Sequence, residues 1–298
     1  MNDEQTKKVR FAYILMACVA VARGTSFIFS KTLMGNYGAL NVLGVRFIIA
    51  FIVLAIVFHK RLMRLVNGDG GVDTRTIAGG FLLGVLYTAI MIAEMQGLKR
   101  VDTGTCSFIE NSAVVIVPFY EALIFRIRPT VRIFICALIT IAGVGFLTIS
   151  SGMTLNAGLI FCVMAALMYA GAIMLTGYLA GRFDPITIGV IQIGTMGVLS
   201  MIGSLIFEEP GLPTDPRDLA MFLMLALVCS CFGFTFQPVA QRYISADTAA
   251  VFTTINPLST CIIGIIFAGE PFGAMRIAGA LLILLGIFLS VRRPSVSE

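Results

Sequence analysis

The sequence predicts an all-α integral membrane protein with ten transmembrane helices, arranged as two inverted five-helix repeats. Three observations lead to this fold class. The 298 residues are 58% hydrophobic and only 12% charged, with a mean hydropathy of +0.97, whereas soluble domains carry about 25% charged residues. Long apolar runs fill most of the chain, and the ends of its two halves are similar at a fixed spacing.

The apolar runs have the length of transmembrane helices, since about 20 residues cross the ~30 Å hydrocarbon core. They cover residues 11–30, 39–58, 77–96, 105–126, 131–150, 157–177, 187–207, 219–238, 247–268 and 274–292. In lipid, backbone groups must be hydrogen-bonded within a helix or within a closed barrel. The run 47–58 does not alternate apolar and polar residues as a barrel strand would, so helices are predicted.

The first run also has features of a signal peptide. Basic residues Lys7, Lys8 and Arg10 precede it, and residues 20–22 (Ala-Val-Ala) look like a cleavage site. We expect the run to remain as a transmembrane helix, because apolar residues resume at Phe27. Cleavage would also leave nine runs, which do not divide into two equal repeats.

The formal charge of +5 reflects where the basic residues sit. If both termini are inside, most lysines and arginines fall in inner loops, and the acidic segment 208–215 lies outside. The positive-inside rule then places both termini in the cytoplasm. We therefore expect a multi-pass protein of the cell (plasma) membrane, surrounded by the lipid bilayer, with no nucleic-acid partner. The longest loop is expected from His59 to about Thr76.

No sequence feature indicates an enzyme, a cofactor or a metal site. The seven cysteines lie in or beside apolar runs, where cysteine usually packs as a small apolar residue. Cys229 and Cys231 would point about 200° apart on a helix, and the single histidine, His59, starts a basic loop. HExxH, GxSxG and P-loop motifs are absent from the sequence. The missing P-loop also excludes a self-contained ATP-driven pump.

The chain is predicted to contain an internal duplication. Arg100 aligns with Arg242 at an offset of 142 residues, and further matches follow through the last two runs of each half. This gives repeats at 11–150 and 157–293. Because each repeat would hold five spans, an odd number, the second copy enters the membrane from the opposite side. Inverted repeats are typical of secondary transporters, whose substrate site lies between them.

Charged residues within predicted spans mark the candidate site, because each costs at least ~2.5 kcal/mol and usually faces a cavity or a partner. Arg23, Arg46, Glu94, Glu110 and Glu121 are such residues. Glu110 and Glu121 are eleven residues apart, which places them on one face of a straight helix. Both signs of charge suit a polar or zwitterionic organic solute, and the carboxylates make protons a candidate coupling ion.

Polar neighbours complete the set of candidates. Tyr87 shares a helix face with Glu94, and Thr253, Asn256 and Thr260 form a polar stripe. The candidate residues for substrate binding or coupling are Arg23, Ser26, Arg46, Tyr87, Glu94, Glu110, Asn111, Glu121, Thr253 and Asn256. In an alternative interpretation these charges only pair with one another, for example Arg46 with a glutamate, or reach the membrane interface.

Two prolines are expected to interrupt predicted spans. Pro118 lies in the fourth and Pro257 in the ninth. Proline removes a backbone hydrogen bond and kinks a helix. Gating kinks and static bends both fit the sequence.

Several motifs resemble the EamA-like branch of the drug/metabolite transporter superfamily. They are Gly24-Thr25-Ser26-Phe27, Arg46-Phe47, Thr103-Gly104-Thr105-Cys106-Ser107-Phe108, Val114-Val115-Ile116-Val117-Pro118, Asn256-Pro257-Leu258 and Gly269-Glu270. The resemblance implies two inverted five-helix repeats around a central cavity. It also implies transport, often outward, of amino acids, other metabolites, nucleobase-like compounds or toxic organics. The family usually has Trp where this chain has Arg23, and that difference indicates a charged solute.

The expected function is secondary transport, as an exporter, of small polar or zwitterionic metabolites such as amino acids, by alternating access. The alternative is an exporter of drugs, toxic organic compounds or nucleobase-like solutes. A membrane enzyme or an accessory protein is less favoured, since an accessory or sensor protein would be expected to carry a soluble domain or a long tail. The oligomeric state is left open.

Overall fold

The computed structural model describes residues 3–67, 73–126, 131–150, 157–268 and 273–291, and all regular structure within these ranges is helical. The elements are α1 (Asp3–Leu33), α2 (Ala39–Val57), α3 (His59–Asn67), α4 (Thr74–Leu98), α5 (Thr103–Asn111), α6 (Ala113–Phe125), α7 (Val131–Ser150), α8 (Ala157–Arg182), α9 (Pro185–Phe207), α10 (Pro216–Met224), the π-helix η1 (Leu225–Phe232), α11 (Gly233–Gln241), α12 (Ala246–Thr253), α13 (Ile255–Ala268) and α14 (Ala274–Val291). The predicted all-α class is confirmed for these residues.

Each range predicted as a span contains one or more helices in the described structure. Among the described residues, seven segments are long and apolar enough to cross a membrane: Glu4–Leu33, Ala39–Val57, Thr74–Leu98, Thr103–Ile124, Ala157–Arg182, Pro185–Phe207 and Pro216–Gln241. The remaining predicted ranges correspond to α7, to α12 followed by α13, and to α14. That these three also cross the membrane stays a prediction.

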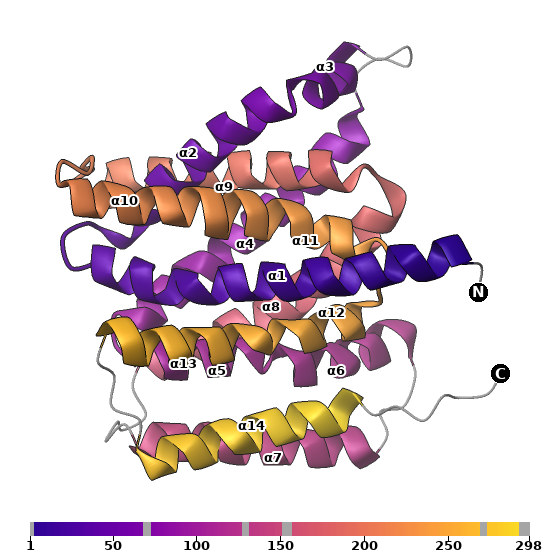
Figure 1. Ribbon diagram of the computed structural model, residues 1–298, viewed down its shortest axis with the longest axis vertical. Helices are drawn as coiled ribbons and strands as arrows, with labels where there is room; N and C mark the ends of the chain where they lie inside the picture. The colour runs from indigo at the N-terminus through magenta and orange to yellow at the C-terminus, as the bar shows by residue number, and fades with distance from the viewer. Residues whose placement is uncertain (1–2, 68–72, 127–130, 151–156, 269–272, 292–298) are drawn as a thin grey trace.

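The helices lie side by side, with α1 near the middle of the molecule (Figure 1). On one side of α1 lie α2, α9 and α10, and on the other lie α5, α6, α12 and α13. The outermost pair is α7 with α14. Packing joins helices of the two halves of the chain, because α2 packs on α9, α7 on α14, α1 on α13 and α8 on α6.

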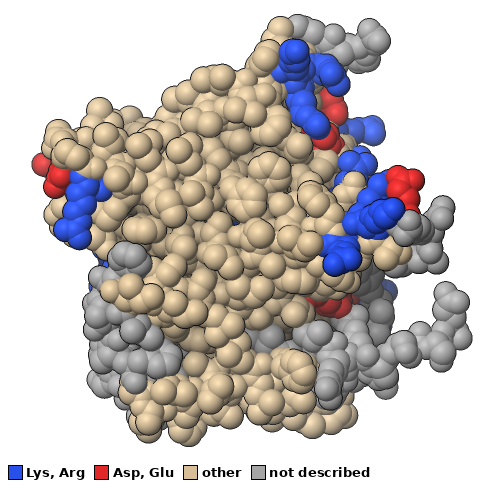
Figure 2. All heavy atoms as spheres, viewed as in Figure 1, with Lys and Arg blue, Asp and Glu red and all other residues tan. Residues whose placement is uncertain are grey.

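The outer surface is apolar, as expected for a protein that faces lipid. Ile56, Leu123 and Phe207 are 69%, 77% and 78% exposed. Figure 2 shows that on the face in view the charged side chains lie at two opposite edges, with an uncharged band between them. The more basic edge carries α3 and the start of α1. Burial of this band in hydrocarbon would remove the apolar surface from water.

Loops gather at the two ends of the helices. At one end Arg61, Arg64, Arg182 and Arg242 surround one cavity, and we call this the basic end. At the opposite end the Lys31 ammonium donates to the Val101 carbonyl (2.9 Å). There the Asn41 backbone N–H also donates to the Glu208 carboxylate (2.9 Å). Arginines that the sequence assigned to inner loops therefore do meet at one end.

The start of the predicted loop 59–76 is a helix, so that part of the prediction was wrong. In α3, Leu62 and Leu65 are three residues apart and so lie on one helix face. Leu62 packs against the core, which stabilises a helix otherwise too short to form alone. Residues 68–72 of the predicted loop lie outside the described residues.

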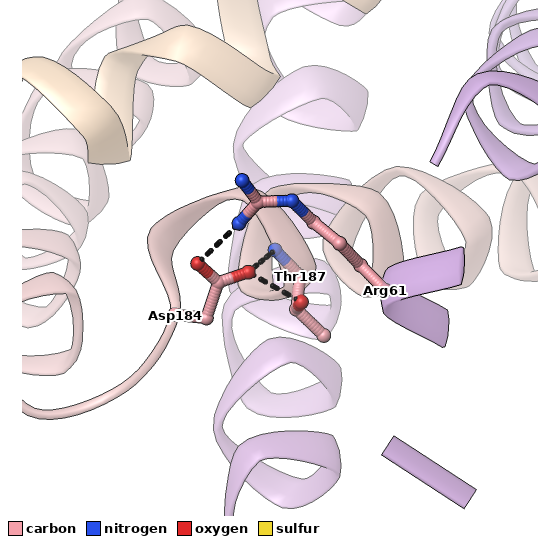
Figure 3. A network of polar contacts seen from close by, with 3 residues as sticks. All are labelled: Arg61, Asp184 and Thr187. Atoms are coloured by element: carbon pink, nitrogen blue, oxygen red, sulfur yellow. Dashed lines mark hydrogen bonds and ion pairs between the residues drawn. The ribbon is translucent and has the colours of Figure 1, made fainter. Parts of the chain in front are cut away.

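Asp184 ties α3 to the start of α9 (Figure 3). Its carboxylate accepts hydrogen bonds from the Thr187 backbone N–H (3.0 Å) and hydroxyl (2.6 Å), and it pairs with the Arg61 guanidinium (2.8 Å). Partial burial acts to raise the pKa of Asp184, but the Thr187 hydrogen bonds and Arg61 outweigh it and hold the pKa below its usual range. The link is therefore intact at neutral pH and is lost as the pH falls through that lowered pKa.

We expect Asp184→Asn to loosen α3, because the amide cannot form the ion pair with Arg61. Hydrogen–deuterium exchange of residues 59–67 should become faster at pH 7. Asp215→Asn makes the same change at the N-cap of α10, at the opposite end, and serves as the control. Unchanged exchange in Asp184→Asn, or an equal change in both variants, would show that the ion pair does not hold α3.

The fourth and ninth predicted spans are interrupted, but not at their prolines. Pro118 lies inside α6 and Pro257 inside α13. The helices break at Ser112 and Thr254, which are 142 residues apart, the offset found in the sequence. At Ser112 the hydroxyl donates to the Ile109 carbonyl (2.6 Å) and competes with the helical pattern. Pro257 has no N–H to offer the Thr253 carbonyl, which fits the break beside that residue.

Glycines allow helices to approach closely, which is typical of membrane helix bundles. A Cβ atom on Gly189 would lie 2.8 Å from Thr235 Cα, so α9 and α11 meet almost backbone to backbone. Gly177 on α8 has no such neighbour within 4 Å among the described residues. The two positions therefore allow the same substitution to be compared.

Gly189→Leu should destabilise the protein by at least about 1–3 kcal/mol, the usual cost of overpacking. Gly177→Leu should change stability little, since there is space for the side chain. Thermal unfolding of both variants in detergent would measure the difference. Equal unfolding temperatures would mean that α9 and α11 do not pack this closely.

Candidate functional site

Arg23 is held at the centre by residues of the second half of the chain. Its guanidinium donates to the Tyr169 hydroxyl (2.8 Å) and to Gln237 Oε1 (2.7 Å). It also lies over the rings of Phe234 (4.5 Å), Tyr169 (4.9 Å) and Tyr87 (5.8 Å). Gln237 Nε2 in turn donates to the Tyr87 hydroxyl (3.2 Å). A buried cation is thus surrounded by aromatic rings and neutral acceptors.

Arg46 on α2 is buried beside α1, the helix that carries Arg23. Its guanidinium donates to the hydroxyls of Ser26 (2.9 Å), Ser30 (3.2 Å) and Ser230 (3.2 Å). Only 1% of Arg46 is exposed, so it does not reach the membrane interface. Among the described residues no carboxylate is a hydrogen-bond partner of Arg46, but Glu94 lies near enough to interact with it electrostatically. The structural pairing of Arg46 with a glutamate therefore stays an alternative prediction.

Glu94 and Glu110 form a buried carboxyl pair. They are 2% and 1% exposed, and their carboxyl groups lie close enough to interact. A proton shared between them would remove the repulsion between two negative charges. Glu94 Oε1 and Glu110 Oε2 have no hydrogen-bond partner among the described residues. Unpaired buried carboxyl oxygens are costly, which indicates that this pair has a purpose other than stability.

A second polar group links α5 with α13. Asn256 Nδ2 donates to Asn111 Oδ1 (3.0 Å), while Asn256 Oδ1 is buried without a partner in the described structure. The Thr260 hydroxyl lies 2.8 Å from the Gly24 carbonyl and 3.2 Å from the Ser107 hydroxyl. The predicted stripe on the ninth span therefore faces the interior. Its first member, Thr253, is also buried but bonds to its own helix at Ala250 (2.7 Å).

A small cavity lies between the charges. Its lining is Arg23, Ser26, Phe27, Arg46, Met91, Glu94, Cys229 and Phe234. Its volume is about 10 Å³, roughly enough for one water, so the protein is closed around this point. We call Arg23, Arg46, Glu94 and Glu110 the central charges.

The central charges lie nearer to the opposite end than to the basic end. Glu94 is four residues before the end of α4, or about 6 Å along the axis, and Arg46 is seven residues after the start of α2, or about 10 Å. Both side chains are buried within the protein at these positions. Each link of Arg23 to Tyr169 or Gln237, and of Arg46 to Ser230, joins the first half of the chain to the second.

Of the predicted site residues, the cavity lining includes Arg23, Ser26, Arg46 and Glu94, and it does not include Tyr87, Glu110, Asn111, Glu121, Thr253 and Asn256. The prediction that Glu121 shares a face with Glu110 assumed one straight helix, and the break at Ser112 separates them. Glu121 lies half-buried on α6. The cavity and its hydrogen bonds do bring together Arg23, Ser26, Arg46, Tyr87, Glu94 and Glu110, while Asn111 and Asn256 join each other nearby.

Tyr169, Gln237 and Ser230 were missed by sequence reasoning. Each is a polar residue in a mostly apolar span, and that was the only signal available. Ser230 lies in η1, and π-helices often occur at functional positions. Spacing along one helix cannot show that two residues more than 140 apart in sequence will meet.

An apolar helical bundle with charges buried between its halves is typical of membrane transport proteins. The EamA-like transporter family matches the chain twice, over residues 10–149 and 156–292, and the chain belongs to this family.

Similar proteins carry transporter names. An "Uncharacterized transporter" of Archaeoglobus fulgidus is 22% identical over 288 residues, covering 94% of this chain and 97% of its own length. "Uncharacterized transporter YcbK" of Bacillus subtilis is 24% identical over 127 residues, covering 41% of each protein. A solved structure titled "Crystal structure of protein" has a TM-score of 0.66 at 13% identity and covers 98% of this chain and 97% of that chain. This last likeness concerns the fold alone.

Proposed function

We propose that the protein exports a small zwitterionic metabolite, such as an amino acid, in exchange for protons. The observation that carries this proposal is the burial of two arginines and two carboxyl groups around one point, where the two halves meet. The solute carboxylate would bind a guanidinium, and its ammonium would bind the Glu94–Glu110 pair. Charge-assisted contacts of this kind are among the strongest available to a protein.

The charges of the site explain the exchange. While Glu94 and Glu110 share a proton, the central charges sum to +1, because two arginines face one carboxylate charge. An ammonium group needs an ionised carboxylate, so a zwitterion entering the site would displace the shared proton. The occupied site would then be neutral: two arginines balance two carboxylates. Solute and proton would therefore compete, which is the requirement for antiport.

For the arrangement in the membrane we propose ten spans, with inverted repeats at 11–150 and 157–293. The breaks at Ser112 and Thr254, one repeat offset apart, and the pairing of α2 with α9 and of α7 with α14 support this arrangement. The arginine-rich end would face the cytoplasm of the cell, together with both termini. Alternating access would require the links of Arg23 and Arg46 to the second half to open.

Nucleobase-like or drug-like solutes are the second candidate. The rings of Tyr87, Tyr169 and Phe234 surround Arg23 and would stack against a planar organic ring. On this alternative, recognition of the solute would depend on the aromatic rings and one charged group, rather than on groups of both positive and negative charge.

Solute counterflow in proteoliposomes distinguishes the two candidates. Purines and amino acids are tested as competitors, each amino acid beside its deaminated acid and its decarboxylated amine. The proposal expects an amino acid to compete better than either matched ion. Equal competition by the amines, or stronger competition by planar purines, would favour the second candidate and contradict the first.

A further inference from the structure

A second cavity lies at the basic end, away from the central charges. Its volume is about 570 Å³ and its lining is Arg61, Arg64, Leu65, Asp73, Thr76, Arg182, Phe183, Asp184, Thr187 and Arg242. None of these residues lines the central cavity. Volumes of this size are typical of ligand sites. The walls come from α3, from the starts of α4 and α9, and from the ends of α8 and α11.

The acidic residues of this cavity are already engaged. Asp73 accepts hydrogen bonds from the Thr76 backbone N–H (3.1 Å) and hydroxyl (2.5 Å). These hydrogen bonds hold the pKa of Asp73 below its usual range. Asp184 is engaged by Thr187 and Arg61 (Figure 3). Four arginines against these two carboxylates leave the lining with a charge of +2.

Two of the four arginines remain available to a ligand. Arg61 is paired with Asp184, and Arg182 donates to the Tyr178 hydroxyl and lies over that ring. The side chains of Arg64 and Arg242 make no hydrogen bond or ion pair with the described residues, yet both line the cavity from different elements. Guanidinium groups converging in this way suit a phosphate group, which they bind through paired hydrogen bonds.

The surroundings place this cavity at the border between lipid and water. α3 follows α2 after a single residue, and the last turn of α2 exposes Ile56 (69%) and Val57 (63%) to its surroundings. Met63, next to Arg64, is 57% exposed. An amphipathic helix with apolar residues beside arginines is typical of the headgroup region, and basic pockets between helices there bind anionic headgroups.

We infer that the basic-end cavity binds the phosphate group of an anionic phospholipid through Arg64 and Arg242. A soluble phosphate ester has the same chemistry, and the exposed apolar residues around the cavity favour the lipid. The inference does not depend on which solute crosses the membrane.

The test compares the lipid dependence of thermal unfolding for the full-length protein in detergent. Phosphatidylglycerol, phosphatidylcholine and glycerol 3-phosphate are the three probes. The variant is Arg64→Gln with Arg242→Gln. The control is Lys60→Gln with Arg75→Gln, which removes the same charge at the same end from residues that do not line the cavity. Size-exclusion profiles and unfolding without added lipid establish that each protein is folded.

We expect phosphatidylglycerol to protect the wild-type protein and the control more than phosphatidylcholine does. In Arg64→Gln/Arg242→Gln the concentration for half-maximal protection should rise at least about tenfold, because paired charge-assisted hydrogen bonds are lost. Equal protection by both lipids, or equal loss in the control, would overturn the inference. If only glycerol 3-phosphate protects the wild-type protein, and this protection is lost in Arg64→Gln/Arg242→Gln, the cavity binds a soluble phosphate ester. That result would contradict the inference of a bound phospholipid.

Discussion

Arg23→Gln is expected to lower solute affinity by at least about 100-fold, because each of two hydrogen bonds from a charged group is worth roughly 1.5–3 kcal/mol. The side chain is the cation at the point where α1, α8 and α11 meet, and it is the proposed partner of the solute carboxylate. Counterflow of the best solute in proteoliposomes would measure the loss. Arg23→Lys keeps the positive charge but lacks the planar guanidinium group that binds a carboxylate through paired hydrogen bonds. Its affinity for the solute should therefore lie between those of the wild-type protein and Arg23→Gln.

A matched change of arginine away from the centre controls for indirect effects. Arg217→Gln alters an exposed residue in the first turn of α10 and should transport normally. Thermal unfolding separates loss of binding from loss of the fold. If Arg23→Gln is folded and its counterflow equals that of the wild-type protein, Arg23 is a structural residue and the proposed site is wrong.

Glu110→Gln should uncouple transport from the pH gradient. Glutamine cannot exchange a proton, and it offers the solute ammonium no negative charge. We expect accumulation driven by an imposed pH gradient to disappear, and residual counterflow to be about tenfold slower and independent of pH. Both are measured with the same labelled solute in the same proteoliposomes.

Glu94→Gln should behave like Glu110→Gln, because the two carboxyl groups act as one pair. Glu209→Gln, a change of the same chemistry at an exposed position of the opposite end, should keep gradient-driven transport. The contradicting result is solute accumulation that still follows the pH gradient in both Glu94→Gln and Glu110→Gln. The shared proton would then have a structural role and no part in the transport cycle.

Much of the fold could be predicted from the sequence because few backbone structures are stable in lipid. Long apolar runs must be helices, and each predicted range contains one or more helices. The errors concern features with a weaker local signal. α3 spans only nine residues with mixed polarity, and the break attributed to Pro118 falls at Ser112, where a hydroxyl hydrogen bond competes with the helix.

The candidate site was partly predictable for the same reason. Arg23, Arg46, Glu94 and Glu110 are conspicuous because a charge in an apolar run must be explained. Their partners were not predictable, since Tyr169 and Gln237 reach Arg23 only through the packing of α8 and α11 on α1. Glu121 has the same chemistry as Glu110, and the break at Ser112 directs the two residues differently.

The most direct test of the account measures protons and solute together. Proteoliposomes that contain a pH-sensitive dye receive an external zwitterionic solute in the absence of a pH gradient. Exchange at the central charges predicts that solute entry makes the interior more alkaline in the wild-type protein, and that Glu110→Gln gives no such change. Solute entry without any change of internal pH in the wild-type protein, or with acidification, would contradict the account.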